Sequence, residues 1–360
     1  MRILVSMSGG VDSSVIAHML KEQGHDLIGV RFTIWQDPLA PPIAQILPSK
    51  CCNAQTIARA NKVAEDLGIP FHHIDLSKEF KRDVVDPFLN EYKSGKTPNP
   101  CVVCNRTIKF GRMIEIANEF GCEKIASGHY ARVMHDKNDD TYHLQEAVDK
   151  TKDQSYYLCQ LTQEQLSRAL FPLGEIHKKD VLALARKYGV PLPKLYQESQ
   201  DVCFYPEKSP REFLDRHLNP KTGDIFDISG KKRGTHRGLP HYTEGQREGL
   251  GIGGLKIPLH VVAKNASSNT ITVGTKEEAA KQELTADHLN WISDEPERNK
   301  EHTYEARIRS QGPKYKGTLV HDGRTLNFTF DKPQIGISPG QFIVLYRGEE
   351  IVGGGVISAL

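Results

Sequence analysis

The sequence predicts an α/β domain with a doubly wound parallel sheet, followed by a small central domain and a C-terminal β-barrel. In the first third of the 360 residues, short apolar runs alternate with helical patterns, which is typical of parallel strands connected by helices on both faces of a sheet. From residue 259 onward, short strands of alternating polarity are separated by Gly and Pro, which is typical of a small barrel. At roughly 150 residues per domain the length fits two or three domains. From the change of pattern along the chain we expect three, at 1–208, 209–275 and 276–360.

The expected elements of the first domain alternate between strand and helix. The strands are expected at 3–5, 27–32, 71–74 and 124–126, and the helices at 12–23 and 53–67. In the first helix Val15, Ile16 and Leu20 share one face, and Gly24 ends the helix. The Pro-rich stretch 38–48 predicts a loop. Ligands of such a sheet bind beyond the carboxyl ends of its strands, where a glycine-rich turn follows the first strand.

The second half of the chain has a different pattern. Residues 219–254 are rich in Gly, Lys, Arg and His and have few periodic apolar residues. Strands are expected at 259–263, 270–273, 303–308, 318–320, 325–330, 342–346 and 351–357.

Composition excludes several classes of protein. Lys and Arg total 47 and Asp and Glu total 45, which gives a net charge of +2 and argues against a polybasic tail or an acidic solvating protein. No apolar run approaches the ~18 residues of a membrane span, so no membrane partner is expected. The first residues reach glycines too early for a secretory signal, and the seven Cys are too few for a disulfide scaffold. We therefore expect a cytoplasmic protein with free thiols.

A glycine-rich turn joins the first expected strand to the first expected helix. Its sequence, SMSGGVDSS at 6–14, is neither GxxxxGK[ST] nor GxGxxG. Glycine lets the backbone approach an anion closely, and the helix that follows offers free N–H groups and the positive end of its dipole. The turn therefore predicts a phosphate-binding loop, although a corner that uses glycine only for geometry is the alternative. The residues expected to contact a nucleotide are Ser6, Met7, Ser8, Gly9, Gly10, Val11, Asp12 and Ser13.

Three of the seven cysteines stand in suggestive contexts. Cys101 and Cys104 form a CxxC pair in a Pro-rich turn, and Cys203 lies in the segment SQDVCF. Thiols that merely line a loop and a thioredoxin-like redox pair are alternatives, although no thioredoxin-type context surrounds the pair. Three thiolates are one short of a closed four-cysteine zinc site, and the open position would suit a catalytic cluster or a thiol relay. Cys51 and Cys52 precede a helix N-terminus, where a thiolate is favoured, so direct chemistry there is the alternative to a structural role. Cys122 and Cys159 are expected to be buried.

The string SxGGxDS resembles the PP-loop ATP pyrophosphatases, and further motifs resemble the tRNA 2-thiouridylase family. These motifs are CCN at 51–53, EYKSGKTPNPCVVCNRTIKF at 91–110, SGHYAR at 127–132, KDQSYYL at 152–158, SQDVCF at 199–204, YTEGQREGLGIGG at 242–254 and SPGQFIVLY at 338–346. The resemblance implies that ATP, with Mg²⁺ held partly by Asp12, adenylates the C2 oxygen of the wobble uridine of a tRNA anticodon. Sulfur then replaces the AMP. The implied partners are a tRNA and a sulfur-donor protein, either a persulfide relay protein or a cysteine desulfurase, and the implied state is a monomer.

The resemblance also implies roles for the three cysteines. Cys203 would carry a persulfide received from the donor, and Cys104 would attack it and form a disulfide with Cys203. The chain departs from the better-known family pattern at Cys101, where that pattern has an aspartate proposed as the general base. A thiol with a reference pKa of about 8.5 is a poor base, but Cys101 completes a trio of thiols. Related tRNA thiolases hold a [4Fe–4S] cluster with three cysteines, so a cluster on Cys101, Cys104 and Cys203 that delivers sulfide is a second mechanism for the same reaction.

The family match extends to nucleotide and tRNA contacts. Phe32 and Gly128 match positions that approach the adenine or ribose. The residues that the match places at the tRNA are Asn99, Pro100, Cys101, His129, Lys152, Asp153, Gln154 and Gln341. A polar helix start is the alternative for 152–154, and a structural histidine is the alternative for His129.

Two basic patches add to this expectation. One is the Gly-rich stretch 231–256, and the other contains Arg307 and Arg309, with Lys314 and Lys316 close by. A charge run is usually a solvated face, but two local patches on a nearly neutral chain fit binding to an RNA backbone.

Two rival functions are weighed against tRNA thiolation. Another PP-loop adenylating enzyme, such as an amide-forming synthetase, would not need Cys104 and Cys203. A catalytically inactive tRNA-binding protein would release no pyrophosphate, and the intact glycine-rich turn and the cysteine trio argue against it.

Overall fold

A computed structural model describes residues 1–41, 54–191, 202–207, 209–253 and 257–359. The chain divides into two compact units. Unit 1 comprises Met1–Val84, Cys101–Lys208 and Glu349–Ile351, and unit 2 comprises Val85–Pro100, Ser209–Gly348 and Val352–Leu360. Both units are therefore discontinuous in sequence.

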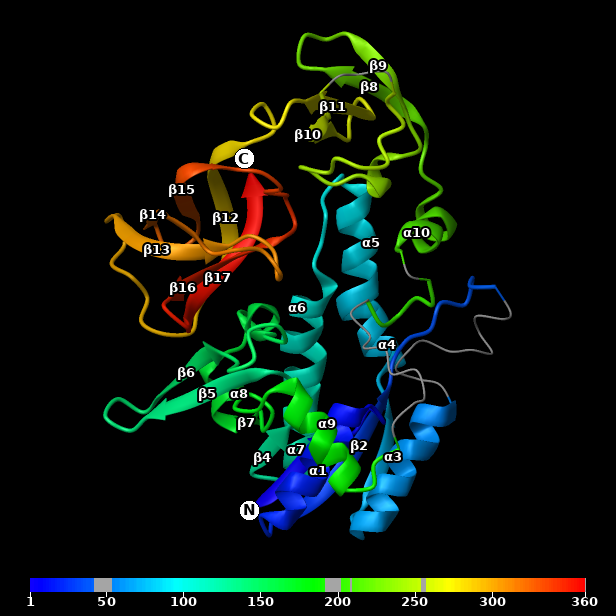
Figure 1. Ribbon diagram of the computed structural model, residues 1–360, viewed down its shortest axis with the longest axis vertical. Helices are drawn as coiled ribbons and strands as arrows, with labels where there is room; N and C mark the ends of the chain where they lie inside the picture. Colours follow the sequence, from blue (N-terminus) through cyan, green and yellow to red (C-terminus); the bar gives the residue numbers. More distant parts are fainter. Residues whose placement is uncertain (42–53, 192–201, 208, 254–256, 360) are drawn as a thin grey trace. The chain divides into compact units, whose positions relative to one another are not determined.

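Unit 1 is built on a five-stranded sheet (Figure 1). The strand order is β3 (Phe71–Asp75), β2 (Asp26–Thr33), β1 (Arg2–Ser6), β4 (Lys124–Ala126) and β7 (Ala169–Leu170). Every neighbouring pair is parallel. The strands predicted at 3–5, 27–32, 71–74 and 124–126 are confirmed. The short β7 was not predicted, because two residues carry no periodic signal.

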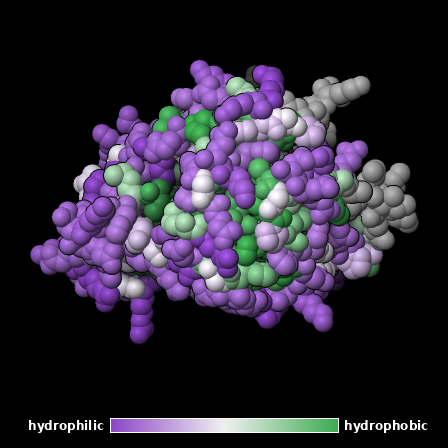
Figure 2. Space-filling view, turned by 90° about the horizontal axis from the view of Figure 1, so that it is seen from below, coloured by the Kyte–Doolittle hydropathy of each residue, from purple (hydrophilic) through white to green (hydrophobic). Residues whose placement is uncertain are grey.

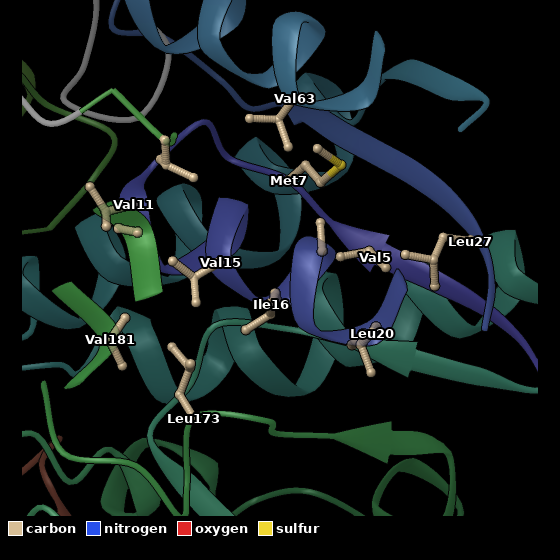
Figure 3. Packing of buried hydrophobic residues seen from close by; sticks show 14 of the residues in the cluster. Val5, Met7, Val11, Val15, Ile16, Leu20, Leu27, Val63, Leu173 and Val181 are labelled. Carbon is tan, nitrogen blue, oxygen red and sulfur yellow. The ribbon is translucent and has the colours of Figure 1, made fainter. Parts of the chain in front are cut away.

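Both faces of this sheet are covered. Ile3, Leu4 and Val5 of β1 are all 0% exposed, although successive side chains of a strand point to opposite faces. Ile3 and Val5 belong to a core cluster with Val15 of the first helix and Val181, part of which is shown in Figure 3. The helices that contribute to this cluster are α1 (Val11–Glu22), α3 (Ala54–Leu67) and α9 (Lys178–Lys187). The doubly wound parallel fold is therefore confirmed.

Between β3 and α9 the chain forms shorter elements. In order they are α4 (Ser77–Phe80), a π-helical segment (Lys81–Val85), α5 (Asp86–Lys93), α6 (Pro100–Cys104), a second π-helical segment (Asn105–Arg112), α7 (Met113–Glu119), β4, the hairpin strands β5 (Ala131–Asp136) and β6 (Thr141–Glu146), a 3-10 turn (Ser155–Leu158), α8 (Gln163–Arg168) and β7. The β5–β6 hairpin was not predicted. Its strands alternate poorly, since β5 buries only Ala131 and β6 buries only Leu144 and Glu146.

Unit 2 contains a four-stranded sheet in its central part. The strand order is β10 (His260–Asn265), β11 (Thr270–Gly274), β8 (Gly223–Asp227) and β9 (Lys232–His236), with α10 (Arg211–Leu218) and a 3-10 turn (Leu239–His241) in the same part. The strands predicted at 259–263 and 270–273 are confirmed. The strands β8 and β9 were not predicted, because β9 buries only His236 and β8 only Ile225.

The rest of unit 2 is a closed antiparallel barrel, which confirms the predicted C-terminal architecture. The strand order is β12 (Lys281–Trp291), β15 (Leu326–Gln334), β14 (Tyr315–His321), β13 (His302–Arg307), β16 (Phe342–Arg347) and β17 (Glu350–Ala359). Pairing of β12 with β17 closes the barrel. Leu319, Phe328 and Ile343 lie in its core at 0% exposure. The strand β12 was not predicted, because irregular registers with both neighbours break its alternation.

Hydrophilic side chains cover most of the face shown in Figure 2, with smaller hydrophobic areas between them. In the described ranges of the chain, no helix has the length and apolar character needed to cross a bilayer.

Candidate active site

The glycine-rich turn leaves β1 and enters α1 with a backbone that requires glycine at one position. Gly9 has φ +79°, and a Cβ atom on it would lie 2.0 Å from the carbonyl oxygen of Thr56. The Arg59 guanidinium donates a hydrogen bond of 2.8 Å to the Gly9 carbonyl. The turn is therefore packed closely against α3, and any side chain at Gly9 would displace it.

Serine hydroxyls brace the start of α1. The hydroxyls of Ser13 and Ser14 donate to the Gly10 carbonyl over 3.0 and 2.9 Å, and the Gly10 N–H donates to the Ser8 hydroxyl over 3.3 Å. Gly10 is the N-cap of α1, and no side chain caps this helix end. Uncapped N–H groups at a helix N-terminus suit phosphate oxygens, so this turn fits the triphosphate of a nucleotide.

Other segments of unit 1 meet at Asp12, which follows the turn. The Tyr130 hydroxyl donates to Asp12 Oδ1 over 3.3 Å, and Lys178 Nζ donates to the same oxygen over 2.5 Å. A Cβ atom on Gly128 would lie 3.4 Å from the Asp12 Cβ and 3.6 Å from the Ser13 nitrogen. The structure thus brings Gly128 against the turn, as expected of a nucleotide contact. Phe32 is half-buried near the carboxyl end of β2.

Sequence reasoning missed three residues of this site, namely Arg59, Tyr130 and Lys178. Tyr130 lies within the matched string SGHYAR, which was the available signal for it. Arg59 and Lys178 stand on helices far along the chain, and nothing in their local sequence marks them.

His129 lies beside the turn but inside the protein. It is 8% exposed, its Nδ1 is 2.8 Å from the Ser127 hydroxyl oxygen, and the rings of Phe110 and Phe171 lie 5.6 and 6.0 Å from its own. Burial, and secondarily Lys109, lowers the pKa of His129 well below its usual value. The imidazole is therefore neutral at pH 7, and contact of His129 with tRNA stays a prediction.

This neutral histidine makes the protein sensitive to acid. The unfolded chain takes up the proton below its pKa of about 6.5, and the folded chain does not. The contribution of neutral His129 to the free energy of unfolding is therefore fully present above about pH 6.5 and is lost as the pH falls below it. We expect His129→Gln to lose less unfolding free energy than the wild type between pH 7.5 and 5.5, by up to about 1.4 kcal/mol. Urea unfolding at the two pH values measures this, and identical losses would contradict it.

The segment 152–154 is held to the same strand that follows His129. Gln154 Oε1 accepts the Tyr130 N–H over 3.0 Å, and the Gln154 N–H donates to the Tyr130 carbonyl over 2.8 Å. The Asp153 carboxylate accepts the Ala147 N–H over 3.0 Å and the Ser155 hydroxyl over 2.9 Å, and burial raises its pKa. Lys152 is half-buried. These bonds support the local fold, and the expected tRNA contacts of Lys152, Asp153 and Gln154 stay predictions.

The cysteine pair occupies a single helical turn. Cys101 and Cys104 stand three residues apart on α6, so they share one face of that helix. Cys104 is 7% exposed, whereas Cys101 and Cys203 are half-buried, and none of the three is in a disulfide. The segment of Cys203 is anchored by Phe204, whose ring packs 5.8 Å from that of Phe80. Before the pair, Asn99 is half-buried and Pro100 is buried.

The other cysteines divide into two sets. Cys122 and Cys159 are buried, as predicted, and burial raises the pKa of both thiols. Cys51 and Cys52 lie outside the described residues.

The three thiols do not form a single-ion metal site. Within the described ranges, the single group of three or more ligand atoms lying within 4.8 Å of one another is Asp136, Asp139 and His143 on the β5–β6 hairpin. The sulfurs of Cys101, Cys104 and Cys203 are therefore not arranged around one ion. A [4Fe–4S] cluster separates its thiolates more widely than one ion does, so the cluster stays a prediction.

Unit 2 holds a cavity of about 710 Å³. Arg309 and Gln341, two expected tRNA contacts, line it together with Lys276 and Tyr315. Gln341 Nε2 donates to the Thr97 carbonyl over 2.7 Å. Arg307 does not line the cavity, and its guanidinium lies 5.1 Å from the centre of the Tyr346 ring.

The charges of the cavity wall favour an anion. Glu244 also lines the cavity, but its Oε2 lies 3.7 Å from Lys264 Nζ, which balances its charge. Lys276 and Arg309 then remain, and neither has an ion-pair partner within the described part of the chain. This wall suits a phosphate group.

Comparisons with known proteins cover the whole chain. A family model described as the tRNA methyl transferase HUP domain matches residues 1–207. Models described as the tRNA methyl transferase PRC-barrel domain and the aminomethyltransferase beta-barrel domain match residues 211–275 and 281–357.

Curated relatives match over their full length. The tRNA-specific 2-thiouridylase MnmA 1 of Caldanaerobacter subterraneus is 43% identical over 360 residues, covering 99% of this chain and 97% of that protein. The tRNA-specific 2-thiouridylases MnmA of Halothermothrix orenii and Nostoc punctiforme are 42% and 39% identical, each covering 99% of this chain and 98% of the relative. A solved structure, a predicted subunit of tRNA methyltransferase from Methanocaldococcus jannaschii, is 18% identical with a TM-score of 0.31, covering 52% of this chain and 74% of that chain. The chain therefore belongs to the tRNA-specific 2-thiouridylase family, and its N-terminal HUP domain places it among the PP-loop enzymes.

Proposed function

We propose that this protein catalyses the ATP-dependent 2-thiolation of the wobble uridine of tRNA anticodons. The observation that carries the proposal is the glycine-rich turn at Gly9 with the uncapped helix end that follows it, in a chain that matches 2-thiouridylases over 99% of its length. ATP activates the C2 oxygen of the uridine as an adenylate and releases pyrophosphate. Sulfur then attacks C2, and AMP leaves.

The nucleotide is bound where β1 meets α1. The N–H groups at the start of α1 and the Ser8 hydroxyl hold the phosphates, and Phe32 and Gly128 lie against the adenosine. Asp12 supplies a carboxylate for Mg²⁺, which neutralises phosphate charge when bound. The uncapped helix end fits this use.

Sulfur reaches the uridine through Cys104 and Cys203. A donor protein loads Cys203 as a persulfide. The Cys104 thiolate attacks the Cys203 sulfur, forms a Cys104–Cys203 disulfide and releases hydrosulfide, which attacks C2. An external thiol reductant then restores both thiols. In the alternative mechanism Cys101, Cys104 and Cys203 would hold a [4Fe–4S] cluster, and its chemistry would be to supply sulfide.

In this proposal the tRNA binds to both basic patches. Residues 1–208 form the catalytic domain, 209–275 a central tRNA-binding domain and 276–360 the barrel domain. The protein acts as a monomer on one tRNA. The target base leaves its stack to reach Cys104, with Asn99, Pro100 and Cys101 beside it.

The direct test is turnover on a tRNA transcript with ATP and a persulfide donor. The expected result is one 2-thiouridine formed for each AMP released. Pyrophosphate release that needs a different acceptor would support the rival synthetase. A product formed only with S-adenosylmethionine would support methyl transfer, the chemistry in the descriptions of the family models.

The cavity of unit 2 gives a further prediction. Replacing Lys276 and Arg309 together by Ala should weaken tRNA binding by about tenfold and lower the salt slope of the binding constant by about 1.5 to 2, since two phosphate contacts are lost. Lys332→Ala with Arg347→Ala is the matched control, because these exposed barrel cations do not line the cavity. An equal effect of the two pairs in salt titrations would contradict a specific role for the cavity.

A further inference from the structure

Lys178 is a buried cation directed at the phosphate-binding turn. Its N–H donates to Asp149 Oδ2 over 3.0 Å, which fixes the first residue of α9. Its side chain is 10% exposed, and its Nζ lies 2.5 Å from Asp12 Oδ1 and 5.5 Å from the centre of the Tyr130 ring. No motif of the sequence marks this lysine, and the function proposed above leaves it without a role.

The charges around Asp12 change when Mg²⁺ and ATP bind. The Asp12 Oδ1 that now accepts Lys178 belongs to the carboxylate expected to hold the metal. An ammonium and a dication repel each other strongly when both approach one carboxylate in a partly buried site. A buried lysine that loses its carboxylate needs another anion. The anion that arrives at this turn is the triphosphate.

The backbone around Asp12 favours movement of the lysine over movement of the aspartate. Asp12 lies in the first turn of α1, and its short side chain moves little unless the helix moves. The Lys178 side chain has a flexible four-carbon stem and rotatable donors. Its ammonium can therefore change partner without movement of α9.

We propose that Lys178 is a phosphate-binding residue of the ATP site, which pairs with Asp12 in the free enzyme and with the triphosphate in the complex with Mg²⁺ and ATP. This inference rests on the proposed function, because it requires ATP at the turn. It adds to the site a residue that distinguishes ATP from adenosine.

The test is calorimetric titration of the full chain with ATP and with adenosine. Lys178→Met should weaken ATP binding by about 10- to 100-fold, the effect of losing a hydrogen bond between charged groups. Adenosine binding should stay within about twofold, since it makes no phosphate contact. The matched control is Lys179→Met, the next residue of α9, which is exposed and should bind ATP as the wild type does.

Two further variants separate phosphate binding from support of Asp12. Lys178→Gln can still donate a hydrogen bond to Asp12 but has no charge, and its ATP affinity should fall as that of Lys178→Met does. In an Asp12→Asn background, Lys178→Met should weaken ATP binding by at least the same factor as in the wild type, because the carboxylate that competes for Lys178 is gone. Thermal melting without ligand identifies a variant that fails to fold. Unchanged ATP affinity in a folded Lys178→Gln, or loss of the effect in the Asp12→Asn background, would overturn the inference, whereas a wild type that binds no ATP would overturn the proposed function instead.

Discussion

Gly9→Ala is expected to lose at least about 100-fold in ATP affinity, which corresponds to two charge-assisted hydrogen bonds. The new Cβ would lie 2.0 Å from the Thr56 carbonyl oxygen, and a backbone atom cannot be displaced as a flexible side-chain end can. The turn must therefore shift, and the N–H groups of α1 lose their alignment with the phosphates. Equilibrium titration with ATP in the presence of Mg²⁺ measures the loss.

The matched control for this variant is Gly24→Ala. Gly24 has φ +78°, nearly the same as Gly9, but nothing lies within 4 Å of a Cβ atom added to it. In both variants an alanine in the left-handed backbone conformation lowers the free energy of unfolding by about 1–2 kcal/mol. Only the Cβ atom at Gly9 also clashes with a neighbouring backbone atom. We expect Gly24→Ala to melt at a lower temperature yet bind ATP normally. Wild-type ATP affinity in Gly9→Ala would refute the phosphate-binding role of the turn.

Cys104→Ser and Cys203→Ser are each expected to lower tRNA thiolation by at least about 1,000-fold, because a serine hydroxyl can neither carry nor release a persulfide sulfur. ATP binding should remain, since neither residue contacts the turn in the proposed site. Quantifying 2-thiouridine in single-turnover reactions measures the effect. Cys122→Ala is the control, because Cys122 is 4% exposed and burial raises the pKa of its thiol. Full thiolation by Cys104→Ser would contradict the sulfur relay through Cys104.

Cys101→Ser separates the two sulfur mechanisms. Protein purified without oxygen is analysed for iron and acid-labile sulfide. The cluster mechanism expects about four irons per chain, lost together with thiolation in the variant. If the persulfide relay operates, the protein should contain no iron. Cys101→Ser should then still thiolate tRNA when a persulfide donor is supplied.

Local patterns were sufficient to predict the frame of the first domain. The strands at 3–5 and 27–32 and the helix that begins near Asp12 were predictable because backbone hydrogen bonding and side-chain periodicity act over a few residues. The glycine-rich turn was predictable for the same reason, since glycines followed by a helix N-terminus are local features. The hairpin of β5 and β6 and the long β12 were not predictable, because few of their residues are buried or because bulges interrupt their period.

The sequence by itself determined the glycine-rich turn, the parallel sheet that presents it and the barrel. Only the tertiary structure decided which distant residues complete the sites. Tyr130 and Lys178 meet Asp12 from 118 and 166 residues away, and Gln341 reaches Thr97 from 244 residues away. It also decided that His129 lies buried against Phe110 and Phe171, which keeps its imidazole neutral. Such contacts depend on how whole elements pack, and no local propensity of the chain encodes them.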